Sequence, residues 1–172
     1  MPSSTPRWLD ADERRTWIGF LYAQTLLFEQ IERDLQRDAG IPLAYYQILV
    51  TLSEHLSRAM RMSDLARSLF FSRSRLSHAV DRLEHNGWIR RDTCPEDRRG
   101  AVAVLTDEGF TALEAAAPKH VESVRTHLFD QLSATQARQL REVSEVLIRH
   151  LIESLKVSAS DVIPEAEYWQ TR

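Results

Sequence analysis

The sequence is poor in the residues that mark several common protein classes. Its 172 residues include one cysteine, five glycines and six prolines. The single cysteine, Cys94, excludes an intramolecular disulfide and a cysteine-rich zinc cluster, and it agrees with a reducing compartment. No apolar run approaches the roughly 18 residues of a membrane span, and the N-terminal segment lacks the apolar core of a signal peptide. We therefore expect one globular domain, residues 1–172, in the cytoplasm and without a membrane partner.

Basic residues are nearly all arginine, and they gather in the middle of a chain that is acidic overall. Only two of the 22 basic residues are lysine, and the formal net charge is −3. Residues 58–100 carry ten arginines against six acidic residues, a net charge of +4, whereas the rest of the chain sums to −7. Arginine presents a planar fork of donors that suits phosphates and guanine edges. Charge alone leaves a nucleic-acid surface and an ordinary solvated face equally open.

Helix-end signals and apolar periodicity predict two helices in the first third of the chain. Asp10 followed by Glu13 resembles a capping box, and the helix that it begins ends near Gly40. Pro42 suits the first turn of a second helix that continues to about residue 56. Both faces of this second helix are largely apolar, so we expect it to be central.

A helix-turn-helix pattern follows. Ser63 and Ser72 can cap a short third helix and a fourth, and Gly87 is a natural left-handed stop. The fourth helix has an apolar stripe made of Leu76, Ala79, Val80 and Leu83. The opposite face is polar and carries Ser74, Ser77, His78, Asp81 and His85, with Arg75 and Arg82 at its edge. This polar face has no core to join, so it is available to a partner.

The rest of the chain predicts a hairpin and two long helices. Residues 88–91 and 101–105 favour a β-hairpin with a charged tip. Thr106 begins a fifth helix that Pro118 should bend, and Ser133 begins a sixth through a capping box. The apolar stripe expected on the fifth helix is Phe110, Leu113, Ala117, Val121, Val124 and Leu128. The stripe expected on the sixth is Leu140, Val143, Leu147, Leu151 and Leu155.

Helix, turn, helix and hairpin form the winged helix-turn-helix arrangement, and residues 63–109 resemble the MarR family of transcriptional regulators. The matching residues keep their spacing without a gap: Leu65-Ala66, Ser72-Arg73, Val80-Asp81-Arg82-Leu83-Glu84, Gly87, Asp97-Arg98-Arg99-Gly100, Leu105-Thr106 and Gly109. The resemblance implies a mainly α fold with a small β-hairpin wing in a six-helix dimeric architecture. It implies a winged lobe over 58–105 and dimerisation helices over 8–40 and 106–156.

The same resemblance implies a homodimeric, sequence-specific regulator of double-stranded DNA. We expect a repressor that binds a pseudo-palindromic operator and is released by a small aromatic or anionic ligand. Apolar stripes on the first, fifth and sixth helices, which one small lobe cannot cover, agree with a dimer.

Candidate DNA contacts lie at the start of the fourth helix, because the first residues of a recognition helix reach deepest into the major groove. They are Arg73, Ser74, Arg75, Ser77 and His78. The two arginines can read bases or contact only phosphate. Asp81 lies too far along the helix to join them and is interpreted as an internal salt-bridge partner. In the wing, the resemblance places Arg99 in the minor groove, with Asp97 orienting it, and Arg98 is expected to meet phosphate.

A ligand pocket is the least determined site. Trp17, Phe20, Tyr45 and Tyr46 can line an aromatic pocket, with Arg90 or Arg91 available to an anionic group. The same aromatics can equally be core residues.

Other functions have little support in the residues. The sequence holds neither a nucleophile elbow nor a glycine-rich phosphate loop, so we do not expect an enzyme. His120 and His127 share a helical face, but no first shell completes a metal site, and no cofactor is expected. Two alternatives remain: a winged-helix module that binds proteins, and redox sensing by Cys94, which lies near several arginines in sequence.

Overall fold

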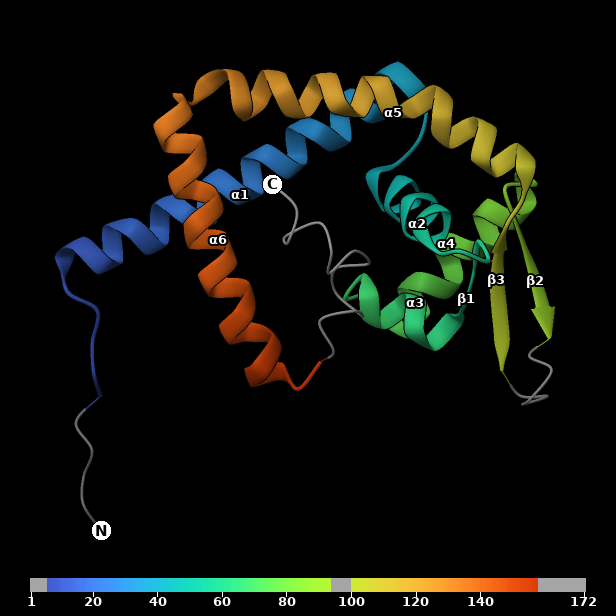
Figure 1. The fold of residues 1–172 in the computed structure, drawn as a ribbon, viewed down its shortest axis with the longest axis horizontal. Coiled ribbons are helices and arrows are strands. Elements are labelled where there is room, and N and C mark those ends of the chain that lie inside the picture. Colours follow the sequence, from blue (N-terminus) through green and yellow to red (C-terminus); the bar gives the residue numbers. More distant parts are fainter. Residues whose placement is uncertain (1–5, 94–99, 158–172) are drawn as a thin grey trace, which may run out of the picture.

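A computed structural model describes residues 6–93 and 100–157. Its helices are α1 (Ala11–Ala39), α2 (Leu43–Glu54), α3 (Met62–Ser68), α4 (Arg73–His85), α5 (Asp107–His127) and α6 (Ala134–Leu155), with a short 3₁₀ turn η1 (Phe129–Gln131). Its strands are β1 (Ala59–Arg61), β2 (Ile89–Thr93) and β3 (Ala101–Leu105). The six helices outweigh a small sheet that lies at one end of the molecule (Figure 1), which confirms the expected mainly α fold with a hairpin wing. None of the helices in the described ranges is long and apolar enough to cross a bilayer.

Local end signals fix most of the helix boundaries. Asp10 and Glu13 form the predicted capping box, and Gly40 ends α1 with a φ of 68°. Such a left-handed conformation costs a glycine little, because it has no Cβ. The Ser133 hydroxyl caps α6 in a second capping box. These predictions are confirmed. They were within reach of the sequence because each cap forms hydrogen bonds to backbone groups no more than one turn away along the chain.

Three predictions between Pro42 and the sheet need correction. Pro42 is the N-cap of α2 rather than a residue of its first turn. Helix α3 begins at Met62, one residue before Ser63, whose hydroxyl donates to Asp64 instead of capping the helix. The sheet has a third strand, β1, which pairs antiparallel with β3 and aligns Ala59 with Val104. Three residues are too few to show a period of two, so the sequence gives no signal for this strand.

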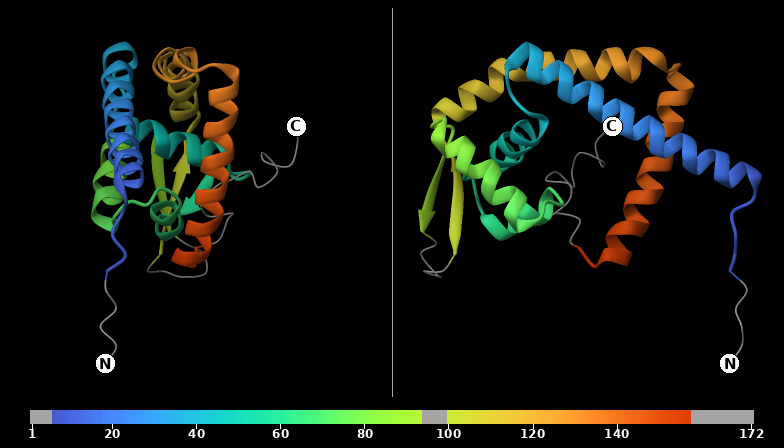
Figure 2. Two further views of the ribbon diagram at one scale, coloured as in Figure 1. Left: turned by 90° about the vertical axis from the view of Figure 1, so that its left-hand side faces the viewer. Right: turned by 180° about the vertical axis from the view of Figure 1, so that it is seen from behind.

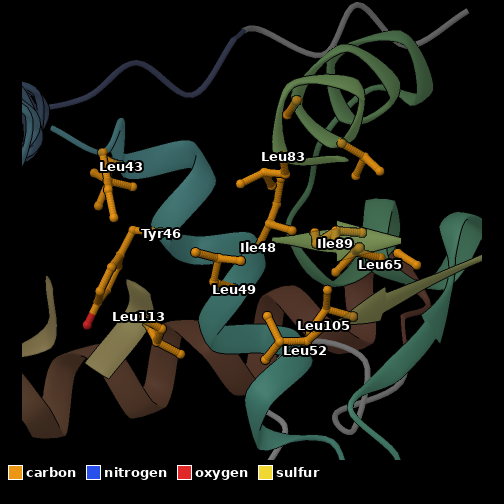
Figure 3. Packing of buried hydrophobic residues seen from close by; sticks show 14 of the residues in the cluster. Leu43, Tyr46, Ile48, Leu49, Leu52, Leu65, Leu83, Ile89, Leu105 and Leu113 are labelled. Carbon is orange, nitrogen blue, oxygen red and sulfur yellow. The ribbon is translucent and has the colours of Figure 1, made fainter. Parts of the chain in front are cut away.

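The core lies around α2, as its two apolar faces predict. Helix α2 contributes Leu43, Tyr46, Ile48, Leu49 and Leu52, and these residues pack against Leu65 of α3, Leu83 of α4 and the sheet residues Ile89 and Leu105 (Figure 3). The apolar stripe of α4 is buried as predicted. Burial of this stripe fixes the rotation of α4 about its own axis and therefore decides which of its residues face solvent.

Helices α1 and α5 pack against each other beyond the winged lobe. The stripe predicted on α5 is only partly right, because Val121 is exposed whereas Ala116 and Ser123 are buried. Pro118 lies inside α5, and Figure 1 shows that the helix bends along its length. A bend changes the face that the second half of the helix presents to its neighbours.

Helix α6 and the N-terminal half of α1 stand apart from the core. Figures 1 and 2 show both on the side of the molecule away from the sheet. No residue of α6 is buried, and its predicted apolar stripe is exposed along its whole length. The N-terminal half of α1 likewise exposes Trp17, Phe20, Leu21 and Leu26.

Candidate nucleic-acid interface

Helices α3 and α4 are joined by a tight turn that presents the start of α4. The Phe71 N–H donates to the carbonyl of Ala66 at 2.9 Å, and the Phe70 N–H donates to that of Arg67 at 3.1 Å. These bonds close α3 with Phe70 in a left-handed conformation, φ 53°. Ser72 then caps α4 by accepting the Arg75 N–H at 3.2 Å, as predicted.

The N-terminal residues of α4 face solvent while its apolar stripe faces the core. Arg73, Ser74, Arg75 and His78 are exposed, and Ser77 is half-buried. The structure thus exposes four of the five predicted major-groove residues at the start of α4 and partly covers Ser77. All five lie within the first two turns, where a recognition helix reaches deepest into a groove.

Arg75 is held in place by an aromatic neighbour. Its guanidinium carbon lies 4.0 Å from the centre of the Phe71 ring. A cation–π contact restrains the side chain without using an N–H donor in the way an ion pair does. Arg75 therefore keeps its donors while losing part of its rotamer freedom.

Two hollows flank α4. One, of about 630 Å³, lies between α4, the start of α3 and the wing, and its lining includes Arg61, Arg73, Ser77 and Arg91. The other, of about 720 Å³, lies between α2 and α4 and is lined by Ala44, Tyr45, Arg75, His78, Ala79, Asp81 and Arg82. The second hollow therefore shares Arg75 and His78 with the candidate DNA surface.

The wing is formed by β2 and β3, which pair antiparallel with Arg91 opposite Ala103. Arg91 reaches from β2 to α4, where its guanidinium lies 2.5 Å from the carboxylate of Asp81. This ion pair confirms Asp81 as an internal salt-bridge partner. The wing-tip candidates Asp97, Arg98 and Arg99, together with Cys94, lie outside the described residues.

The five candidate ligand residues are not gathered into one pocket. Trp17 and Phe20 pair on the exposed half of α1, with ring centres 6.4 Å apart. Tyr46 is buried and packs on His120 at 4.5 Å, so it is a core residue. Tyr45 lines the hollow between α2 and α4. Arg90 lies on β2, where it donates to Asp92 at 3.2 Å.

A polar cluster joins α1 to α5. Asp34 is buried, with only 6% of the residue exposed. It accepts from the Ser123 hydroxyl at 2.8 Å and lies 2.8 Å from His127 Nε2. Arg37 donates to its other oxygen at 2.9 Å. Burial raises the pKa of Asp34, but the hydrogen bonds from Ser123, His127 and Arg37 outweigh it and hold that pKa below its usual value.

The two histidines that share the α5 face have different surroundings. His127 belongs to the Asp34 cluster, whereas burial lowers the pKa of His120, whose Nδ1 atom has no hydrogen-bond partner among the described residues. No group of three or more His, Cys, Asp or Glu side chains within residues 6–93 and 100–157 is placed to hold a metal ion.

Known proteins share this architecture and sequence. A family profile described as the MarR family matches residues 39–100. The chain is 48% identical to Sco3205, a MarR family transcriptional regulator from Streptomyces coelicolor solved in complex with DNA, with a TM-score of 0.79 over 87% of this chain and 93% of that one. The chain belongs to the MarR family.

Other relatives of this MarR-family chain agree. AbsC, also from Streptomyces coelicolor, is 42% identical with a TM-score of 0.76, covering 85% of this chain and 98% of that one. The transcriptional repressor MprA of Escherichia coli K12 is 30% identical over 76% of this chain and 73% of its own length. The protein is therefore a DNA-binding transcriptional regulator and not an enzyme, as the sequence predicts.

Sequence reasoning missed the role of Arg91, which it grouped with Arg90 as a possible ligand residue. The alternation of side chains along β2 could have indicated this role. Ile89 is apolar and Arg91 lies two residues later, so both point to the same face of β2. That face is the one that packs on α4.

Proposed function

We propose that this MarR-family regulator is a homodimeric repressor that binds a pseudo-palindromic operator and is released by a small ligand. The observation that carries the proposal is the open start of α4. Arg73, Ser74, Arg75 and His78 are exposed there, on a helix whose other face is buried. Arginine can donate two hydrogen bonds to guanine, and serine and histidine can address bases or phosphate. MprA, a relative, is a repressor.

Dimerisation is supported by apolar surface that the described chain leaves uncovered. We assign it to segments 8–40 and 106–156, and we assign DNA binding to the winged lobe, 58–105. The exposed apolar residues of α1 and α6 are Trp17, Ile18, Phe20, Leu21, Leu26, Phe28, Leu140, Val143, Val146, Leu147, Leu151 and Leu155. Exposed apolar surface of this extent is typical of an interface. Two winged lobes on a two-fold axis would contact half-sites about one helical turn, roughly 10 bp, apart.

The wing is assigned to the flanking minor groove. The family resemblance assigns Arg99 to that groove, Asp97 to its orientation and Arg98 to phosphate. A narrow A·T-rich minor groove concentrates negative potential and attracts an inserted arginine.

Ligand release is assigned to the neighbourhood of Tyr45. The hollow of about 720 Å³ beside it also contains Arg75, Arg82 and His78, which suit an aromatic anion. A ligand there competes with DNA for Arg75 and His78, so binding of the two is mutually exclusive. Trp17, Phe20 and Arg90 remain candidates only for a site that a partner subunit completes, and Tyr46 is a core residue that does not line this hollow.

The operator and the wing can be tested together. DNA selected from a random pool by the wild-type protein should contain a pseudo-palindrome. On operators with identical half-sites, Arg99→Ala should weaken binding most where the flanks are A·T-rich, and Asp97→Ala should produce a smaller loss of the same kind. Equal losses on A·T-rich and G·C-rich flanks would reduce Arg99 to a phosphate contact.

The ligand assignment has its own test. Aromatic carboxylates and phenols should include a compound that raises the melting temperature and lowers operator affinity, and Tyr45→Ala should weaken both effects. Compounds that shift the melting temperature without changing operator affinity would contradict the proposed release.

A further inference from the structure

Arg91 ties the wing to the recognition helix at several points. Besides its ion pair with Asp81, its guanidinium donates to the backbone carbonyl of Ser77 at 3.1 Å and lies 3.5 Å from the Glu84 carboxylate. Its own backbone N–H donates to Glu84 at 3.1 Å. Both the side chain and the backbone of one β2 residue are therefore held by α4.

The geometry of the two elements explains why Arg91 makes these contacts. Ser77, Asp81 and Glu84 follow one another at spacings of four and three, so they line one face of α4 over two turns. Arg91 shares the α4-facing side of β2 with Ile89, whereas Arg90 points away and is the more exposed. A planar guanidinium can reach three acceptors along such a face, which a single ammonium cannot.

The contacts act more as a restraint than as a source of stability. The side chains of Asp81 and Glu84 are 51% and 41% exposed, against 28% for Arg91. Ion pairs at such partly exposed positions contribute little to folding free energy. Strand β2, however, is an edge strand of the sheet, and it ends at Thr93, two residues after Arg91. A restraint at this point limits how far β2 can move relative to α4.

Arg91 also neutralises two carboxylates on the helix assigned to the major groove. Asp81 and Glu84 would otherwise oppose nearby phosphates. An arginine that is paired with two carboxylates binds a further anion poorly. The contacts of Arg91 therefore serve to join β2 to α4.

We propose that Arg91 is a positioning residue that fixes the wing relative to α4, and so fixes the number of base pairs between the sequence read by α4 and the flank read by the wing. The inference rests on the proposed DNA contacts of α4 and the wing. It adds a determinant of operator spacing that touches no DNA.

Operators with shifted flanks test the spacing. The A·T-rich flank is moved by one base pair relative to an unchanged half-site, and binding is measured by fluorescence anisotropy. The wild-type protein should lose about fivefold or more in affinity, and Arg91→Ala should change by less than about twofold between the two operators. Arg91→Lys should be intermediate. If Arg91→Ala keeps the wild-type preference for the original flank position, the positioning role of Arg91 is overturned.

A double variant separates positioning from charge. Asp81→Asn in the Arg91→Ala background removes a bare carboxylate, so it should recover part of the overall affinity but not the spacing preference. Recovery of both would mean that Arg91 acts only by neutralising charge, and would overturn the proposal.

Hydrogen exchange of the free protein gives a readout that does not depend on DNA. Arg91→Ala should speed amide exchange in β2 and β3 while α4 stays protected. Arg33→Ala, which removes an exposed ion pair of α1, should change neither. If amide exchange in β2 and β3 of Arg91→Ala equals that of the wild type, the positioning role of Arg91 is contradicted. A different outcome is possible: Arg91→Ala speeds amide exchange, but the wild-type protein binds the original and the shifted operators equally well. That outcome contradicts the proposed DNA contact of the wing, and with it the role of Arg91 in operator spacing.

Discussion

Arg75 is the residue on which direct base reading most depends. Its position in the first turn of α4 and its restraint by Phe71 present several donors at low entropic cost. Arg75→Ala should cost about 1–3 kcal/mol on the selected operator and relax the preference at a single base pair of each half-site. Binding to selected and random DNA, measured at one salt concentration, gives the comparison. His85→Ala, at the other end of α4, should leave the preference intact. Equal losses on both DNAs would make Arg75 a phosphate contact.

We expect Asp34 to contribute to the acid stability of the α1–α5 packing. Its carboxyl pKa is held below the ordinary value of 3.8, so the unfolded chain binds its proton more tightly than the folded chain does. The contribution of Asp34 to stability is therefore fully present above that value and is lost as the pH falls below it. Urea unfolding at a fixed protein concentration should show this loss, and Asp34→Asn should remove it.

The Asp34→Asn protein should also be less stable at neutral pH, by about 1–3 kcal/mol, since an amide cannot accept from all of Ser123, His127 and Arg37. Asp12→Asn, at the exposed start of α1, is the control. A pH profile of Asp34→Asn that parallels the wild type below pH 4 would show that other carboxyls dominate.

At the scale of an element, the turn between α3 and α4 carries avoidable strain. Phe70 is 59% exposed and has a φ of 53°, a region that side chains with a Cβ occupy at a cost of about 1–2 kcal/mol. Phe70→Gly should raise the free energy of unfolding by about 0.5–1 kcal/mol, because glycine's greater freedom in the unfolded state offsets part of the relief. Chemical denaturation at equal protein concentration measures the change.

Gly87 provides the opposite substitution. It has a φ of 76°, and no surrounding atom lies within 4 Å of the position that a Cβ would take, so Gly87→Ala tests conformation without a steric clash. Gly87→Ala should destabilise the protein by about 1 kcal/mol.

The Phe70 prediction has its own contradicting outcome. A Phe70→Gly protein less stable than wild type would mean that the Phe70 ring makes a stabilising contact that outweighs its backbone strain.

At the scale of the whole molecule, the dimer interface proposed on α6 can be tested. Its stripe is exposed from Leu140 to Leu155 although its spacing is that of a buried face. Leu147→Asp places a charge in the middle of that stripe and should halve the mass measured by light scattering at micromolar concentration. Operator affinity should fall by at least about tenfold, because two linked lobes bind far more tightly than one.

Arg149→Asp is the matched control, because it introduces the same side chain on the other face of α6. It should leave the mass unchanged. A wild-type protein that is monomeric at micromolar concentration with its operator affinity intact would exclude the dimer altogether.

The sequence by itself determined the features that depend on neighbours within one or two turns. The Asp10 and Ser133 capping boxes, the Ser72 cap, the left-handed Gly40 and the apolar stripe of α4 all follow from short-range hydrogen bonds and from the helical period. The hairpin was predictable for the same reason. Because the α4 stripe must be buried, the other side of the helix had to face outward, so the exposure of Arg73, Ser74, Arg75 and His78 could be predicted from sequence alone.

Only the tertiary structure decided the features that join distant segments. Strand β1 exists because β3, more than 40 residues later, pairs with it. Asp34 looks like an ordinary surface carboxylate until α5 brings Ser123 and His127 to it. Arg90 and Arg91 are adjacent and chemically identical, and the pleat of β2 alone sends one outward and the other onto α4. Such contacts depend on how elements dock, and docking is set by the summed burial of many side chains rather than by any local pattern.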